Sequence, residues 1–374
     1  MLLLCNRLTR DSDCYLQGDV WRLRAGGLTE EACGRLSAAL SRAGAAWKRR
    51  DAAAERLIVA EGSLEAIRGA VEKGAGAEGG GELLEQALRR RRERGGVLPR
   101  ALEGMQAAGA AVMGILNVTP DSFSDGGLYF EREKAVVRAL ELHSSGAHIV
   151  DIGGESTRPG AESVSEEEEL RRVLPVIEGI MGERSIPLSI DTMKSAVAAA
   201  ALDAGALVVN DVGGMASAGM RAVAAERGCP VVVMHMKGNP RSMQEDPRYA
   251  DVVYEVASFL AERIRVCVNE GMDECSIIVD PGIGFGKTPA HNLQLLSELD
   301  ALFSLGRPVL VGASRKSFIK AAGGEGGGRL EGSIASALYA HMMGAQILRV
   351  HDVSGTVRAL SVWDSIDGGK APPP

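Results

Sequence analysis

Short apolar runs alternate with longer segments of helical periodicity from about residue 111 onward. Eight of these runs have the length and the nearly continuous apolar character of buried strands. They cover residues 112–118, 148–153, 187–191, 207–211, 230–235, 276–280, 308–313 and 347–351. Strands that alternate with helices predict parallel pairing with right-handed crossovers. We therefore predict an α/β fold, a closed (β/α)₈ TIM barrel, with an open doubly wound sheet as the alternative.

The first hundred residues follow a different pattern. Thr29 and Ser63 are each placed to cap a helix. The glycine-rich stretch 74–81 has the composition of a flexible linker. The basic run 89–94 is interpreted as a solvated helix face. No motif in this region indicates a chemical role.

These patterns predict three parts. Residues 1–105 form a smaller N-terminal extension of unknown role, mostly helical with a Gly-rich linker, and residues 106–367 form the barrel. Residues 368–374 form a disordered tail. Because every strand-end polar group comes after residue 105, we expect a barrel that starts near Leu102 to fold without the extension.

Composition narrows the class of protein. Of the 374 residues, 45% are hydrophobic, and the net charge is −7, so the chain lacks the basic footprint of a nucleic-acid binder. No apolar run approaches the ~18 residues of a membrane span, and no cationic region precedes the apolar start as in a secretory signal. The six cysteines show no metal-ligand spacing. We expect a cytoplasmic protein with no nucleic-acid partner and no membrane partner.

Each predicted barrel strand ends in a polar residue or runs into one. One such residue is usually a turn residue, but a ring of them suits a barrel active site, which collects at the carboxyl ends of the strands. Charged groups there cost desolvation free energy unless a partner or a polar ligand compensates. In chain order these residues are Asn117, Asp151, Asp191, Asn210, His235, Asp280, Ser314 and His351.

Two loops mix glycine, proline and small hydroxyl residues, as covering loops do: residues 117–127 and 153–160. We predict that residues 119–127 and 155–164 are mobile before substrate binds. The segment 282–288 resembles a phosphate-binding loop, but Pro281 stands where its first glycine belongs. We therefore reject a nucleotide site there.

The strand-end motifs resemble those of dihydropteroate synthases. The two long signatures are GILNVTPDSFSDGG at 114–127 and DIGGESTRPG at 151–160. Six shorter motifs follow in order: SIDT at 189–192, NDV at 210–212, MHM at 234–236, DPGIGFGK at 280–287, SRKS at 314–317 and RVHDV at 349–353. The resemblance covers about residues 111 to 366. The glycine-rich stretch 323–328 departs from the usual seventh helix.

The resemblance implies a transferase of folate biosynthesis. Its reaction condenses 6-hydroxymethyl-7,8-dihydropterin pyrophosphate with p-aminobenzoate to give 7,8-dihydropteroate and pyrophosphate. Such a reaction needs a pterin slot, an anion site and a lid that excludes water. The residues that the resemblance assigns to the pterin are Asp191, Asn210, Met234, Asp280, Phe285 and Lys316, with Asp151 supporting them.

The resemblance also implies sites for the other groups. Arg349 and His351 stand two apart on one strand, so they share a face and suit the pyrophosphate. Asn117 offers an oxygen to Mg²⁺ carried in on the pyrophosphate. The catalytic set is thus Asn117, Lys316, Arg349 and His351. The p-aminobenzoate pocket is assigned to Phe123, Thr157, Arg158, Pro159 and Ser317.

Two other functions compete with this interpretation. A pterin-binding methyltransferase barrel shares the fold and the pterin-facing acids but has no pyrophosphate to bind, which the motif at 349–351 disfavours. A non-catalytic paralogue would bind pterin only. Barrels of this family are often dimers, so a homodimer is the assembly that the resemblance suggests.

Overall fold

The computed structural model describes residues 2–7, 21–52, 55–75, 79–93, 96–105, 109–119, 128–156, 161, 163–323 and 329–367. The chain forms two compact units. The N-terminal unit comprises Met1–Gly96, Arg248–Ala261 and Leu293–Arg307, and the barrel unit comprises Val97–Pro247, Glu262–Asn292 and Pro308–Pro374. Within the described ranges, no helix has both the length and the apolar character needed to cross a membrane.

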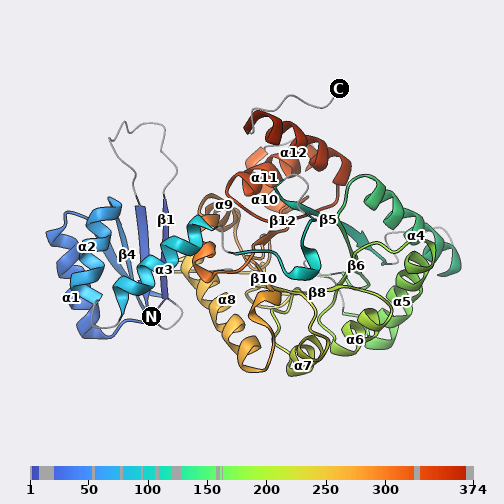
Figure 1. The fold of residues 1–374 in the computed structure, drawn as a ribbon, viewed down its shortest axis with the longest axis horizontal. Helices are drawn as coiled ribbons and strands as arrows, with labels where there is room; N and C mark the ends of the chain where they lie inside the picture. The colour runs from blue at the N-terminus through green and yellow to red at the C-terminus, as the bar shows by residue number, and fades with distance from the viewer. Residues whose placement is uncertain are drawn as a thin grey trace. The chain divides into compact units, whose positions relative to one another are not determined.

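The barrel unit contains the predicted parallel sheet (Figure 1). Its eight strands pair in the order β10-β9-β8-β7-β6-β5-β12-β11, and a bridge between Val279 and Val309 links the two ends of that order. The predicted TIM barrel is confirmed. The strands are β5 (Ala111–Asn117), β6 (Ile149–Gly153), β7 (Leu188–Asp191), β8 (Val208–Asp211), β9 (Val231–Met234), β10 (Ile277–Asp280), β11 (Leu310–Val311) and β12 (Ile347–Val350).

Helices connect successive strands. Ser165 caps one of them, because its hydroxyl accepts a hydrogen bond from Glu168 N at 3.2 Å. In the seventh connection, two helices flank residues 324–328, which lie outside the described residues. The helices are α4 (Leu128–Ser144), α5 (Glu166–Glu183), α6 (Ser195–Asp203), α7 (Ala218–Arg227), α8 (Val252–Asn269), η4 (Glu274–Ser276), α9 (Pro289–Ser297), η5 (Leu299–Leu305), α10 (Ser317–Gly323), α11 (Arg329–Met342) and α12 (Val353–Asp367).

An apolar cluster fills the amino-terminal end of the barrel. It takes residues from the starts of the strands, including Ala111, Ile149 and Ile347. Leu98 and Leu102 also belong to this cluster, and Leu102 lies on the short helix η2 (Arg100–Leu102). The barrel unit therefore starts at residue 97, earlier than the predicted boundary at residue 105. The tail 368–374 lies outside the described residues.

The N-terminal unit contains an antiparallel sheet with strand order β1-β2-β4-β3. This sheet was not predicted from the sequence, whereas Thr29 and Ser63 accept the predicted capping bonds from Ala32 N and Ala66 N at 3.2 and 3.1 Å. The elements are β1 (Leu2–Arg7), β2 (Trp21–Gly26), α1 (Glu30–Arg42), β3 (Ala46–Ala52), β4 (Glu55–Gly62), α2 (Leu64–Ala75) and α3 (Gly80–Arg92).

The glycine-rich stretch 74–81, predicted as a linker, overlaps the ends of two helices. Gly74 lies in α2, and Gly80 lies in α3. A Cβ atom on Gly74 would lie 2.4 Å from the Leu36 Cα. Glycine is needed there because α1 and α2 pack closely, not because the chain bends freely.

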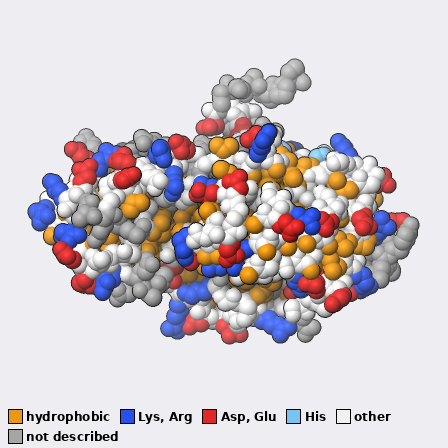
Figure 2. Space-filling view, turned by 60° about the horizontal axis from the view of Figure 1, so that its bottom comes forward, with side chains coloured by type: hydrophobic (Ala, Val, Ile, Leu, Met, Phe, Trp, Pro, Cys, Tyr) orange, Lys and Arg blue, Asp and Glu red, His pale blue; other side chains and the backbone are white. Residues whose placement is uncertain are grey.

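The central strands β2 and β4 of the N-terminal sheet are buried on both faces over much of their length. One face packs against α1 and α2 through an apolar cluster that includes Leu23 and Ile58. Arg24 points from the other face and is 1% exposed. The segment η5 packs against β1 and α3 within the same unit. On the view in Figure 2, acidic and basic side chains are interspersed, in keeping with the modest net charge of −7.

Candidate active site

The predicted polar ring is found at the carboxyl ends of the barrel strands. Asp151, Asp191, Asn210 and Asp280 lie on β6, β7, β8 and β10, and all four are buried. Parallel strands in register bring these ends to one rim of the barrel. The neighbouring registers pair Gly153 with Asp191 and Asp191 with Asn210.

Arg349 of β12 lies at the centre of this rim. Its Nε donates to Asp151 Oδ2 and its Nη2 donates to Asp191 Oδ2, each at 2.6 Å. Asn210 Nδ2 donates to the same Asp151 oxygen at 3.0 Å. The other Asp151 oxygen, Oδ1, is buried and has no hydrogen-bond partner among the described residues. A buried acceptor without a donor costs free energy, so the rim suits a ligand that brings one.

One guanidinium here faces more than one acid. Burial raises the pKa of Asp191 to about 7, although Arg349 acts in the opposite direction and Asp151 adds to the rise. Burial also raises the pKa of Asp280 to about 6, while the hydrogen bond from Gly282 N lowers it. Burial alone would lower the pKa of Arg349, but Asp151 and Asp191 outweigh it and raise that pKa. The rim therefore holds buried acids whose charges Arg349 does not fully offset.

An apolar surface lies beside the acids. Phe285, Met234, Met243 and Val212 form a buried cluster. The Lys316 Nζ lies 3.9 Å from the centre of the Phe285 ring. Burial lowers the pKa of Lys316 to about 8. This combination of flat apolar surface and cation suits a planar heterocycle with polar edges.

Lys287 organises the turn that carries Phe285, a role that was not predicted from the sequence. Its buried Nζ contacts Gly282 O at 2.9 Å, Phe285 O at 3.0 Å and His235 Nδ1 at 2.9 Å. Burial lowers the pKa of Lys287 to about 7 and the pKa of His235 well below its ordinary value. His235 thus serves as a neutral acceptor in the wall of the site. The signal for this role was a lysine directly after the glycine-rich turn.

His351 has different partners from Arg349. Its backbone N and its Nδ1 contact Ser314 Oγ at 3.3 and 3.1 Å. Burial, together with the charges of Arg315 and Arg349, lowers the pKa of His351 to about 4. The two residues share a strand end as predicted, but the guanidinium faces the acids, whereas the imidazole faces Ser314. Near neutral pH, His351 is therefore a neutral imidazole.

Comparison with known proteins assigns this rim to a family. Residues 113–351 match the family described as "Pterin binding enzyme". The dihydropteroate synthase of Escherichia coli (strain K12) is 48% identical over 255 residues, which cover 68% of this chain and 90% of that protein. The chain belongs to the dihydropteroate synthase family. The activity predicted from the sequence, and its class as a transferase of folate biosynthesis, are confirmed.

Solved dihydropteroate synthases agree with this assignment. The Xanthomonas albilineans enzyme with 4-aminobenzoic acid is 49% identical, has a TM-score of 0.66, and matches over 70% of this chain and 94% of that one. The same enzyme in complex with 7,8-dihydropteroate is 46% identical, has a TM-score of 0.63, and matches over 70% and 95%. The family match begins at residue 113, so the first segment of the N-terminal unit lies outside it.

Part of the predicted dihydropteroate synthase site lies outside the described residues, namely Phe123, Thr157, Arg158 and Pro159 with most of both loops. Ser317, at the start of α10, is described and exposed. The structure therefore leaves the predicted p-aminobenzoate pocket and the predicted loop mobility as predictions.

The predicted magnesium ligand stands at the end of β5. A Cβ atom on Gly153 would lie 3.8 Å from Asn117 Oδ1 and 3.6 Å from Asp191 Cβ. Glycine thus leaves space between the amide and the carboxylate. No group of three or more His, Cys, Asp or Glu side chains that could hold a metal ion occurs in the described part of the chain. A single amide oxygen fits a Mg²⁺ ion whose other ligands come from phosphate and water.

Proposed function

We propose that this rim joins 6-hydroxymethyl-7,8-dihydropterin pyrophosphate to p-aminobenzoate. The arylamine nitrogen forms a bond to the methylene carbon, the bond from that carbon to the pyrophosphate oxygen breaks, and the amine loses a proton. The observation that carries the proposal is the partly buried Arg349 held between the buried Asp151 and Asp191, with one Asp151 oxygen unpaired among the described residues. The substrate supplies the missing donor and takes part of the arginine's charge.

The pterin would lie against the acids and the apolar cluster. Its ring N–H and amino groups donate to carboxylate and amide oxygens of Asp191, Asn210 and Asp280, while Asp151 holds Asn210 and Arg349 in place. Lys316 donates to the ring, and Met234 and Phe285 pack on its faces. Both lysine and ring are in place before the pterin arrives, because Lys316 already lies over Phe285.

The pyrophosphate would lie at Arg349 and His351. Arg349 supplies a full positive charge, and His351 supplies a neutral N–H donor because its pKa is lowered to about 4. Asn117 would be the one protein ligand of Mg²⁺, which when bound would supply positive charge to the leaving group. These residues stabilise charge that grows as the carbon–oxygen bond breaks.

The p-aminobenzoate pocket would be completed last. It is assigned to Ser317 and to the loop residues Phe123, Thr157, Arg158 and Pro159. The root of the second loop is already fixed, because Lys194 pairs with Glu155 and lies 2.5 Å from Glu169 Oε2. We expect p-aminobenzoate to bind weakly to the free protein and more tightly once pterin, pyrophosphate and Mg²⁺ have ordered the loops.

The test is turnover by the purified full chain. Pterin pyrophosphate, p-aminobenzoate and Mg²⁺ should yield dihydropteroate, and chelation of Mg²⁺ should reduce the rate. In a binding titration, p-aminobenzoate should bind at least tenfold more tightly when pterin, pyrophosphate and Mg²⁺ are present, an effect of about 1.4 kcal/mol. A protein that binds the pterin but forms no dihydropteroate would support the methyltransferase or the non-catalytic alternative.

The proposal also covers the location of the protein in the cell and its oligomeric state. The thiols of Cys229, Cys267 and Cys275 are free, which suits the reducing cytoplasm. A homodimer is the proposed assembly, and sedimentation of the full chain checks it.

A further inference from the structure

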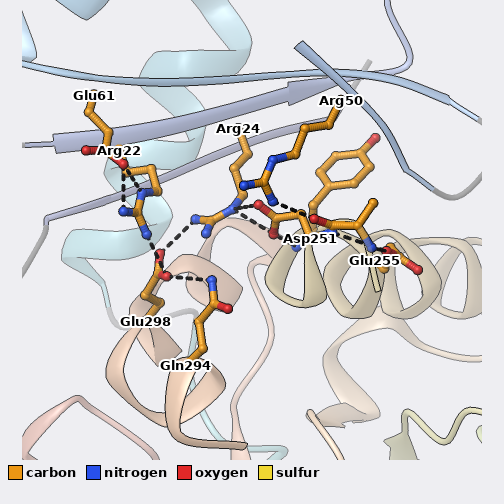
Figure 3. Close-up of polar contacts among 10 residues, drawn as sticks. Arg22, Arg24, Arg50, Glu61, Asp251, Glu255, Gln294 and Glu298 are labelled. Carbon is orange, nitrogen blue, oxygen red and sulfur yellow. Dashed lines mark hydrogen bonds and ion pairs between the residues drawn. The ribbon is translucent and has the colours of Figure 1, made fainter. Parts of the chain in front are cut away.

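Two arginines of β2 connect the first segment of the N-terminal unit to its later segments (Figure 3). Arg24 Nε lies 3.0 Å from both carboxylate oxygens of Asp251, and its Nη1 lies 2.9 Å from Glu298 Oε2. Arg22 Nη1 donates to Glu298 Oε1 at 2.7 Å, and its Nη2 donates to Glu61 at 2.6 Å. One strand thus holds acids from two distant parts of the sequence.

This ionic cluster is buried and well supplied with partners. The Arg24, Asp251 and Glu298 side chains are 1%, 3% and 7% exposed. Asp251 Oδ1 also accepts from Tyr254 N at 2.9 Å, and Glu298 Oε1 also accepts from Gln294 Nε2 at 3.1 Å. Buried charges with this many partners hold one geometry, because any displacement leaves a charge without compensation.

The cluster fixes the first turn of α8. Asp251 directly precedes α8, and Tyr254 lies against Gly26, where a Cβ atom would come within 1.8 Å of the Tyr254 hydroxyl. Arg50 of β3 donates to Ala250 O at 2.5 Å. The residues that lead into α8 are therefore held by two strands of the N-terminal sheet.

The segment just before α8 supports the proposed pterin slot. It runs from His235 at the end of β9 to Pro247, all within the barrel unit. Gln244 Nε2 donates to Gly284 O at 2.6 Å, in the turn that carries Phe285. Met243 packs in the same apolar cluster as Phe285. Only Arg248 to Ala250 separate this segment from Asp251 along the chain.

We propose that Arg24 is a positioning residue for the pterin slot. By fixing Asp251, it limits the conformations of the segment 236–250 and so holds Gln244 and Met243 against the turn of Phe285. The first segment of the N-terminal unit thereby serves the catalytic rim without contributing a group that touches substrate. This inference rests on the proposed function, because it takes Phe285 to be a face of the pterin slot.

The experiment compares two arginines of one strand. Arg24→Met removes the partner of Asp251, whereas Arg22→Met, the matched control, removes a partner of Glu298 and Glu61 only. Pterin affinity is measured by calorimetry with a pterin analogue, well below the melting temperature of each variant. We expect Arg24→Met to weaken pterin binding about tenfold and Arg22→Met to leave it within twofold.

Further measurements separate positioning from a general loss of stability. The KM for the pterin substrate should rise in Arg24→Met, while the KM for p-aminobenzoate at saturating pterin stays within twofold. Hydrogen exchange of residues 237–249 should be faster in Arg24→Met than in Arg22→Met. Arg24→Lys, which keeps one contact, should recover part of the affinity.

A second variant keeps the test decisive if Arg24→Met does not fold. Gly26→Ala preserves every charge but displaces Tyr254, and it should weaken pterin binding in the same direction. The inference is overturned if Arg24→Met and Gly26→Ala bind pterin as the wild type does, or if Arg22→Met weakens binding equally. Absence of pterin binding in the wild type would instead overturn the proposed function.

Discussion

Two arginines, the buried Arg24 and the partly buried Arg349, each bridge a pair of acids from separate elements. Around Arg24, Glu298 is so well compensated that its pKa is lowered, because Arg24 and Arg22 outweigh the effect of burial. Around Arg349, burial prevails and the pKa of Asp191 rises to about 7. Asp151 Oδ1 has no hydrogen-bond partner in the described ranges, whereas Glu298 has partners on both oxygens.

The difference distinguishes a structural ion cluster from a binding site. A cluster that stabilises the fold satisfies its own charges, since any deficit lowers the free energy of unfolding. A site that awaits a charged, hydrogen-bonding ligand keeps a deficit for the ligand to remove. Buried acids and an arginine occur in the structural cluster and in the binding site alike. The two are distinguished only by whether every charged atom already has a partner within the protein.

The largest expected effect follows from deleting residues 1–96. The deletion removes the cations beside buried Asp251 and Glu298, and breaking a buried pair from one side costs about 3–5 kcal/mol. Because domains are stable by about 5–15 kcal/mol, we expect the shortened chain to lose cooperative thermal unfolding. This reverses the expectation from the sequence. A chain starting at Val97 that melts and turns over like the full protein would show the two parts to be independent.

Substituting each arginine by methionine should separate stability from activity. Arg24→Met should lower the free energy of unfolding by about 3–5 kcal/mol. Arg349→Met should cost less stability, because Asp191 readily takes a proton, yet it should lower kcat/KM by about 10²–10³. Urea unfolding and steady-state kinetics on both variants provide the measurements. Equal losses of stability would remove the distinction between the two clusters.

Asp280→Asn tests the rim at one acid. The substitution replaces a charged acceptor by an amide, and a mismatched buried hydrogen bond costs about 1–3 kcal/mol, so pterin affinity should fall about ten- to a hundredfold. Asp211→Asn is the matched control, because Asp211 is also buried and bonds to Gly213 N and Met215 N. Calorimetry with a pterin analogue measures the affinity of both variants. Unchanged affinity in Asp280→Asn would remove this residue from the slot.

The smallest effect concerns pH. Asp191, with its pKa raised to about 7, contributes stability at low pH that is lost as pH rises from about 4 through 7. Glu298, with its pKa lowered, contributes stability above its ordinary pKa that is lost as pH falls through its folded pKa. An NMR titration of the side-chain carboxyls should show Asp191 titrating near pH 7 and Glu298 at the acid end. Similar titration midpoints for Asp191 and Glu298 would mean that the clusters around Arg349 and Arg24 do not differ in their electrostatics.

The barrel could be predicted because its strands are buried on both faces. Apolar runs such as those ending at Asp191 and Asp280 stand out from the helices between them, and the structure shortens them by only a residue or two. The order of the strand-end groups follows from parallel topology. The hydrogen-bond partners of these groups do not follow from the topology, because Arg349 and His351 share a strand end but their side chains turn to different neighbours.

The N-terminal unit could not be predicted because its polar residues are buried. Arg22 and Arg24 alternate with Leu23 and Ala25, a pattern that indicates a solvated face. Their actual partners, Asp251 and Glu298, lie far away in the sequence. No local rule connects an arginine to an acid more than two hundred residues later.

That separation affects how the chain is made. The N-terminal sheet leaves the ribosome first, but the partners of Arg24 lie 227 residues later at Asp251 and, for Arg22, 276 residues later at Glu298. At about 5–20 residues per second, the sheet waits roughly 14 to 55 s with its arginine face uncovered. During synthesis the earliest part of the protein therefore cannot finish folding until one of the latest parts has been translated.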